Sequence, residues 1–267
     1  MQNEGESASF QVALQRAVAR KRQHPALDQL IGDDRLMRAL RDDPAAWEKD
    51  GPLTLPGCLA SELPEFCPPV PIIRALNENL RELCAAGAIR RRGQLARKLL
   101  NGEQFLNTQS ELALARTLSS AGWYVQLEET FFDGRDADIL ATRGAEKRFI
   151  EVTNLALKEL GGGVHGGQIG QLGHKDRVVQ KIANKYREKF EVPLENGWAE
   201  HAWVALDVAK NHLESVDTFF QTLLRLPQWN NDLAAHVRRE CPRLSGVVVY
   251  HSAPAATHVD VDAWCEL

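Results

Sequence analysis

The sequence predicts an α/β protein in which helices flank a mixed β-sheet and a helical region precedes the sheet. Three observations lead to this prediction. Apolar residues recur at every third or fourth position through much of the first hundred residues, as in amphipathic helices. From about residue 105, short apolar runs alternate with helical patterns in the order α-β-β-β-α-β-α-β. Glycine and proline separate these segments, and 267 residues suffice for one large domain or two small ones.

The predicted N-terminal helical region covers residues 1–100. Helical spacing is present at residues 9–23, 27–43 and 71–87. The last of these segments begins with proline and ends on Gly87, as helices commonly do. Residues 51–71 hold six of the twelve prolines, and each proline removes a backbone donor and clashes with the preceding turn. We therefore expect an extended connector at 51–71, and a basic segment at 90–102 closes the region.

Residues 105–267 are predicted to form the second domain. In order, we expect a helix at 108–122, three strands within 123–154, a helix at 175–190, a strand at 201–209, a helix at 216–226 and strands at 245–252 and 256–262. The segment 161–173 has seven glycines in thirteen residues but no G-K-[ST] ending, so it is not the phosphate-binding loop of nucleotide hydrolases. It is either a loop that closes over a ligand or a disordered connector.

The composition limits the possible partners. A formal net charge of −4 excludes a histone-like mode of nucleic-acid binding, although it leaves room for a local basic groove. No apolar run reaches the length of about 18 residues that a membrane span requires, so no membrane contact is expected. The polar N-terminus does not resemble a signal peptide, and the five cysteines lack C-x-x-C spacing. These features favour free thiols and a cytoplasmic location.

Two acidic residues, Asp138 and Glu151, lie in apolar runs on either side of Gly144-Ala145. Glycine at the first central position suits a two-residue type II′ hairpin. Such a turn predicts the cross-strand pairs Thr142–Lys147, Leu140–Phe149, Asp138–Glu151 and Asp136–Thr153. Directly opposite residues share one face of a sheet with Cβ atoms about 5 Å apart, and like charges there are destabilising.

A divalent cation between the two carboxylates would remove this conflict, because Mg²⁺ binds one or two carboxylates together with water. A turn that is longer, or shifted by one residue, would instead place Asp138 and Glu151 on opposite faces or at the rim of the sheet. The spacing alone leaves both arrangements open.

These residues resemble the motifs of the PD-(D/E)xK nuclease superfamily, which has the restriction-endonuclease-like fold with an α-β-β-β-α-β core. The resemblance covers about residues 105–210. Asp138 matches the Asp of the first motif, Glu151 matches the acid of the second, and Glu111 matches an acid that many members carry on the preceding helix. Thr153 stands where the motif has lysine. In some members this lysine has moved to the following helix, where the present sequence has Lys181 and Lys185 on one face.

The resemblance implies Mg²⁺- or Mn²⁺-dependent phosphodiester hydrolysis. Asp138 and Glu151, with Glu111 and the backbone carbonyl of Val152, would hold the metal, which lowers the pKa of a bound water. A lysine would orient this water and offset the negative charge of the transition state; Lys181 is the first choice and Lys185 the second. Thr153 would support the site by hydrogen bonding a ligand water.

Several of these residues have structural alternatives. Glu111 also completes a T-x-x-E capping box with Thr108, in which the glutamate reaches back to the cap amide. Lys181 and Lys185, with Arg177, could form only the solvated face of an amphipathic helix.

Further residues are candidates for contacts with nucleic acid. They are Arg177, His165 and His174 near the glycine-rich segment, and Arg91 and Arg92 in the basic segment. Contacts with phosphates give affinity without sequence preference. The alternative is that the histidines are solvent-exposed and the arginines form a solvated helix start.

Three functions are compatible with the sequence. The first is a metal-dependent endonuclease, with DNA favoured over RNA as the substrate. The second is a catalytically decayed protein on the same scaffold that binds nucleic acid or a protein partner without cleavage, which Thr153 in the lysine position favours. The third is an interaction module that recruits a protein partner through the N-terminal helical region.

Overall fold

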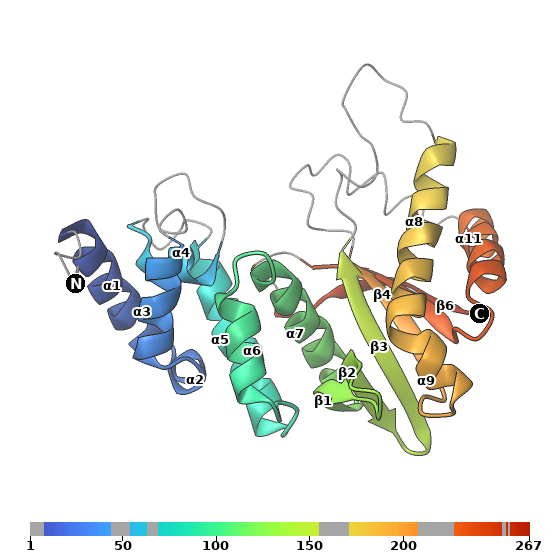
Figure 1. Cartoon of the computed structure of the whole chain (residues 1–267), viewed down its shortest axis with the longest axis horizontal. Helices are drawn as coiled ribbons and strands as arrows, with labels where there is room; N and C mark the ends of the chain where they lie inside the picture. The colour runs from blue at the N-terminus through green and yellow to red at the C-terminus, as the bar shows by residue number, and fades with distance from the viewer. Residues whose placement is uncertain are drawn as a thin grey trace. The chain divides into compact units, whose positions relative to one another are not determined.

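Six strands form one mixed sheet in the second half of the chain, as the computed structural model shows (Figure 1). The structure describes residues 8–43, 54–62, 69–154, 171–207, 227–252, 255 and 257–267. The strands are β1 (Tyr124–Thr130), β2 (Asp136–Arg143), β3 (Glu146–Asn154), β4 (Ala202–Asp207), β5 (Gly246–His251) and β6 (Asp260–Glu266). The predicted mixed α/β architecture is therefore confirmed.

The helices of the first part are α1 (Ala8–Arg22), α2 (Pro25–Leu30), α3 (Asp33–Asp42), α4 (Leu55–Ala60), α5 (Pro69–Ala85), α6 (Arg92–Leu100) and α7 (Phe105–Ser120). Those of the second part are α8 (Gln171–Lys185), the π-helical turn η2 (Tyr186–Phe190), α9 (Glu191–Glu195) and α11 (Pro227–Glu240). None of these helices has the length and apolar character needed to cross a membrane.

The chain divides into two compact units. One comprises Met1–Arg116 with Pro254–Thr257, and the other comprises Thr117–Ala253 with His258–Leu267. The division falls inside α7. The first unit therefore contains α1 to α6, and the second contains the whole sheet with α8 and α11.

Basic residues of α1 stabilise the first unit from within. Arg16 donates to the carbonyl of Ala60 over 2.8 Å, and Arg20 donates to the carbonyl of Cys58 over 2.7 Å. These carbonyls lie at the C-terminal end of α4, where helical backbone acceptors lack partners.

Lys21 of α1 is buried and bonds three oxygens. Its ammonium donates to the carbonyl of Ile31 at 2.8 Å and lies 2.8 Å from Asp28 and 2.6 Å from Asp33. Burial lowers the pKa of Lys21, but the hydrogen bonds to the two carboxylates more than offset this, so the pKa is raised overall. The basic residues of α1 therefore stabilise the first unit.

The proline-rich connector is partly helical, in contrast to our prediction. Helix α4 lies within 51–71, and Thr54 caps it by accepting from the amide of Gly57 at 3.1 Å. Pro56 stands in the first turn, where a missing amide donor is tolerated. Helix α5 likewise begins at Pro69, two residues earlier than predicted.

The sheet has the strand order β1-β2-β3-β4-β5-β6. Strands β1 to β3 form an antiparallel meander, β3, β4 and β5 run parallel, and β6 returns antiparallel to β5. Helices α8 and α11 lie side by side against the sheet (Figure 1). The core beneath them includes Phe149, Val204, Val249, Ile182 and Val237. The helix α8 and the turn η2 thus follow β3 and return the chain to β4.

The helices after β3 differ from the prediction. Helix α8 begins at Gln171, inside the segment predicted as a glycine-rich loop. Helix α11 was not predicted, although it begins with Pro227 and has Arg238 and Arg239 in its last turn, which are helix start and stop signals. The helix predicted at 216–226 lies outside the described residues.

Candidate active site

The hairpin between β2 and β3 has the predicted register. Arg143 pairs with Glu146, Thr142 with Lys147 and Leu140 with Phe149. Gly144 has φ of 62°, as the first central position of a type II′ turn requires. The two-residue turn fixes the alternation of side chains, so that Leu140 and Phe149 share a face.

The backbone pairing between β2 and β3 ends just before Asp138. The last recorded pair is Ile139–Ile150, and beyond it the amide of Val152 donates to Oδ2 of Asp138 at 2.9 Å. The predicted pairs Asp138–Glu151 and Asp136–Thr153 lie in this opened part. Asp138 therefore uses one carboxylate oxygen to hold β3, and its half-buried side chain lies at the opening.

Glu151 is buried on β3, with a side chain only 3% exposed. Lys185 of α8 donates to its Oε1 at 2.9 Å. The other oxygen, Oε2, is buried and has no hydrogen-bond partner in the described part of the chain. A buried carboxylate oxygen without a partner is unfavourable, which suggests that a cation or a proton completes this site.

The environment of Glu151 opposes its ionisation. Burial raises the pKa of Glu151 well above its ordinary value, and the nearby Asp138 carboxylate raises it further, while Lys185 and Lys189 act in the opposite direction. A perturbed carboxyl beside a second acid and a lysine is typical of functional sites.

A second ion pair lies beside the first. Lys189 donates to Oδ1 of Asp136, the first residue of β2, at 2.7 Å. The turn η2 carries Lys189 and follows α8 directly, and π-helical turns are frequent at functional sites. Burial lowers the pKa values of Lys185 and Lys189, but the facing carboxylates more than offset this and both pKa values are raised. Both lysines are therefore cations at neutral pH.

The cluster Asp136, Asp138, Glu151, Lys185 and Lys189 has a formal charge of −1, from three acids and two lysines. No group of three or more His, Cys, Asp or Glu side chains in the described ranges is arranged to hold a metal ion. Two protein ligands nevertheless fit Mg²⁺, which keeps several waters. Oε2 of Glu151 is the atom that such a cation would satisfy.

Glu111 is buried in the first unit, where Lys98 lies 3.2 Å from its Oε2. The capping-box interpretation is wrong. Thr108 lies inside α7, which begins at Phe105, and its hydroxyl donates to the carbonyl of Gln104 at 2.9 Å. The buried Phe105 extends the helix by one turn beyond the expected start, so Thr108 cannot act as the cap.

Thr153 is buried on β3, two residues after Glu151 and hence on the same side of the strand. Lys181 is half-buried one turn before Lys185 on α8. The recorded contact with Glu151 is made by Lys185, which favours Lys185, our second choice, as the working lysine.

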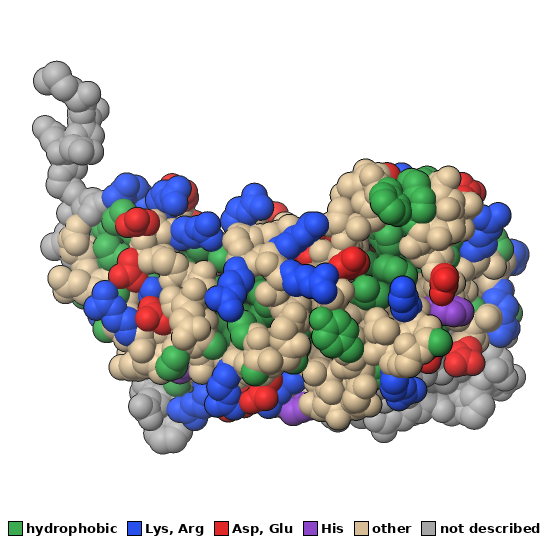
Figure 2. Space-filling view, turned by 90° about the horizontal axis from the view of Figure 1, so that it is seen from below, with side chains coloured by type: hydrophobic (Ala, Val, Ile, Leu, Met, Phe, Trp, Pro, Cys, Tyr) green, Lys and Arg blue, Asp and Glu red, His purple; other side chains and the backbone are tan. Residues whose placement is uncertain are grey.

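Only some of the residues predicted to contact nucleic acid lie in the described part of the chain. Arg91 and Arg92 are exposed at the start of α6. His174 and Arg177 belong to α8, but their side chains lie outside the described part, and His165 is not described at all. On the face shown in Figure 2, Lys and Arg side chains are interspersed with Asp and Glu.

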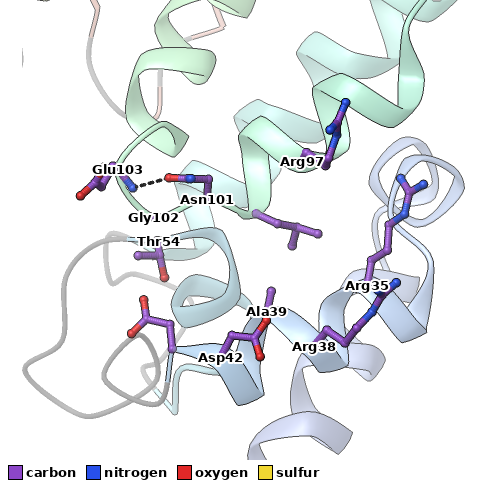
Figure 3. A pocket seen from close by; sticks show the side chains of 11 residues that line it. Arg35, Arg38, Ala39, Asp42, Thr54, Arg97, Asn101, Gly102 and Glu103 are labelled. Carbon is purple, nitrogen blue, oxygen red and sulfur yellow. Dashed lines mark hydrogen bonds between the residues drawn. The ribbon is translucent and has the colours of Figure 1, made fainter.

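A groove of about 960 Å³ lies in the first unit. Arg35 and Arg38 of α3 and Arg97 of α6 lie on one side, whereas Asp42 and Glu103 lie toward the other (Figure 3). The groove is thus positive at one end and negative at the other. No local sequence pattern predicts this groove, because α3 and α6 are distant in the chain.

Two further features near the candidate site were missed from the sequence. Glu128 is buried in β1 and has φ of 58°, an unusual value for a residue with a side chain. It lies between the pairs Leu127–Ile139 and Glu129–Ala137, which places it opposite Asp138.

The second missed feature is Phe132, between β1 and β2. Its side chain is 90% exposed, and its ring packs edge-to-face against Trp198 at a centroid distance of 5.8 Å. An aromatic pair in a sequence normally indicates core packing, so exposure of this kind is visible only in the structure.

Comparisons of the chain with protein-family models, with curated proteins and with solved structures find no match.

Proposed function

We propose that the chain is a metal-dependent nuclease that hydrolyses phosphodiester bonds in nucleic acid. The observation that carries the proposal is the buried Glu151 carboxylate. One of its oxygens binds Lys185, the other has no hydrogen-bond partner in the described part of the chain, and Asp138 lies close enough to raise its pKa. Two acids can hold a metal ion that activates water, and a lysine can offset the negative charge of the transition state.

Asp138 and Glu151 would hold Mg²⁺ or Mn²⁺. When bound, the metal lowers the pKa of a coordinated water and offsets negative charge on the phosphate. Asp138 is oriented for this role because the amide of Val152 holds its Oδ2. Lys185 remains protonated, since its pKa is raised, and can therefore donate to a phosphate oxygen or to the attacking water.

The element order supports the proposal. Helix α7, strands β1, β2 and β3, helix α8 and strand β4 follow one another as in the α-β-β-β-α-β core of the superfamily that the motifs resemble. The two acids stand on β2 and β3, and Lys185 stands on the following helix, in place of the lysine that Thr153 replaces. A fold alone does not decide function, so activity must be measured.

The experiment is a cleavage assay with labelled single-stranded and double-stranded DNA and RNA in Mg²⁺, in Mn²⁺ and in EDTA. We expect metal-dependent cleavage, with DNA favoured over RNA, that is lost in Asp138→Ala and Glu151→Ala. Glu200→Ala is a matched control, because Glu200 is an exposed acid that precedes β4. Full activity in both Asp138→Ala and Glu151→Ala would reject the site.

The second candidate function is binding without cleavage, which Thr153 in the lysine position favours. It predicts salt-dependent affinity for nucleic acid with no turnover in any divalent metal. Metal-dependent turnover that requires Lys185 would exclude it.

The groove of the first unit favours a protein partner for this part of the chain. A phosphate backbone would be attracted by Arg35 and Arg97 but repelled by Asp42 and Glu103. A peptide with acidic and basic residues at opposite ends matches both sides. Calorimetry with such a peptide tests this, with a peptide of the reversed sequence as the control. Arg97→Glu should weaken the binding of the matching peptide and leave that of the reversed peptide unchanged.

A further inference from the structure

We propose that Phe132 and Trp198 form a stacking platform for an unpaired nucleobase, so that the substrate is nucleic acid with a single-stranded segment. This inference rests on the proposed function and names its substrate class. Phe132 is 90% exposed, whereas the other exposed large apolar residues in the described ranges, Tyr124 and Val12, are 51% and 50% exposed. Phe132 thus presents almost a whole ring to solvent.

The loop that carries Phe132 is held by its own backbone. The amide of Phe131 donates to the carbonyl of Arg135 at 2.8 Å, and the amide of Gly134 donates to the carbonyl of Phe131 at 3.1 Å. Gly134 has φ of 83°, which a residue with a side chain rarely adopts. The amide of Arg135 donates to Oδ1 of Asp133 at 3.0 Å. This tight loop fixes the direction in which Phe132 points.

The partner ring is also fixed. The amide of Trp198 donates to the carbonyl of Pro193 at 2.8 Å, and its half-buried side chain packs against the core beneath α8. The rings of Phe132 and Trp198 are inclined by 67°. Because Trp198 packs against the core, it holds the ring of Phe132 in place, and the exposed face of Phe132 can stack on a base.

The platform is built on the same elements as the candidate active site. Phe131, the neighbour of Phe132, is buried with its ring 5.2 Å from Phe149 and 6.4 Å from Phe190. Phe149 precedes Glu151 by two residues on β3, and Phe190 directly follows Lys189, which binds Asp136. The loop of Phe132 and the candidate active site are therefore supported by the same two elements, β3 and η2.

An unpaired base is the occupant that fits best. Every base has a π-face that stacks on an aromatic ring. A divalent cation on the acids would change the formal charge of the cluster from −1 to +1, and the cluster would then attract the phosphate backbone. In a duplex both faces of a base are already stacked, so Phe132 can reach only a base that is unpaired or splayed out. A stable protein interface buries about 800 Å² on each partner, far more than two rings provide.

The test measures binding in EDTA by the full chain, so that no cleavage occurs. The probes are a fluorescein-labelled mixed-sequence single strand and the duplex of the same sequence, followed by anisotropy. We expect the single strand to bind more tightly. Phe132→Ala should weaken single-strand binding about tenfold, the loss expected for one stacked base, and leave duplex binding unchanged. Phe132→Trp should retain affinity.

Tyr124→Ala is the matched control, because Tyr124 is an exposed aromatic residue at the other end of β1. Binding of the single strand should also quench the fluorescence of the wild type more than that of Trp198→Phe. Equal loss of both probes in Phe132→Ala, no loss, or tighter binding of the duplex by the wild type would overturn the inference.

Failure of the platform and failure of the proposed nuclease can be distinguished. If no metal supports cleavage but Phe132→Ala still loses single-strand affinity, the nuclease proposal fails and the platform stands. If cleavage depends on Glu151 but Phe132→Ala binds and cleaves like the wild type, the platform fails and the nuclease proposal stands.

Discussion

The ammonium of Lys185 donates to the buried carboxylate of Glu151 over 2.9 Å, and this contact connects the helix after the hairpin to the centre of the sheet. Lys185 is separated from Glu151 by 34 positions in the chain, so only the return of α8 across the sheet brings them together. The contact leaves Oε2 of Glu151 without a hydrogen-bond partner among the described residues.

Replacement of Lys185 should lower the rate of metal-dependent cleavage, whereas the same replacement of Lys181 should not. We expect Lys185→Met to lower the rate of metal-dependent cleavage by about 10²–10³-fold, the effect of losing one donor to developing charge. Lys185→Arg should restore part of the rate, because it keeps the charge in a different shape. Single-turnover kinetics at saturating metal is the measurement.

Lys181→Met is the matched control, since Lys181 lies one turn earlier on the same helix. It should cleave like the wild type. If Lys181→Met is inactive and Lys185→Met is active, the working lysine is Lys181, and the contact with Glu151 is structural.

The stability of the metal-free protein should depend on the ionisation of Glu151. Burial and Asp138 raise its pKa well above the ordinary 4.5, so the folded state binds a proton more tightly than the unfolded state. This contribution to stability is fully present below the ordinary pKa and is lost as the pH rises through the folded pKa. Glu151→Gln should therefore melt at a higher temperature than the wild type in EDTA at pH 8.

The difference in melting temperature should shrink as the pH falls below 4.5, where the wild-type carboxyl is protonated in both the folded and the unfolded state. Glu188→Gln is a control, because Glu188 is exposed and lies 3.9 Å from the same Lys185. An advantage of Glu151→Gln that is constant with pH would contradict this origin.

Divalent metal should stabilise the wild type through the same carboxylates. At 10 mM Mg²⁺ and a dissociation constant of about 1 mM, binding to the folded state would add about 1.4 kcal/mol of stability. Chemical unfolding with and without Mg²⁺ measures this gain, which should disappear in Asp138→Asn and Glu151→Gln. A gain retained in both variants would place the metal elsewhere.

The sequence was sufficient to predict the hairpin because its information is local. Gly144 at the first position of a two-residue turn determines the register, and the register determines which side chains share a face. The acids Asp138 and Glu151 could be proposed for the same reason. That the ladder opens at Asp138 was not predictable, because it depends on a side chain that replaces a backbone acceptor.

The remaining errors have separate causes. Thr108 and Glu111 match a capping pattern, but the buried Phe105 continues the helix and overrides it. Helix α11 was missed because asparagines after Pro227 are poor helix formers, although its packing against α8 compensates. The turn η2 and the exposure of Phe132 have no local signal, since both depend on packing between elements distant in the chain.

The packing of the sheet requires glycine at position 246, because a side chain there would have no space. A Cβ at Gly246 would overlap the ring atoms of Trp203 on the adjacent strand β4. This ring cannot move easily, because the guanidinium of Arg148 stacks on it with 4.5 Å to the centroid and also stacks on Trp123 at 4.8 Å. Gly246→Ala should therefore lower the free energy of unfolding by about 3 kcal/mol, as overpacking of a rigid core does.

The matched control is Gly93→Ala, in α6 of the first unit. The nearest atoms to a Cβ there belong to the side chain of Arg35 at 3.9 Å, so the space is open. Since alanine favours a helix by about 0.5–1 kcal/mol over glycine, Gly93→Ala should be neutral or stabilising. Urea unfolding followed by Trp fluorescence reports on both variants. If Gly246→Ala is as stable as Gly93→Ala, the stack of Trp203 on Arg148 yields more readily than its packing implies.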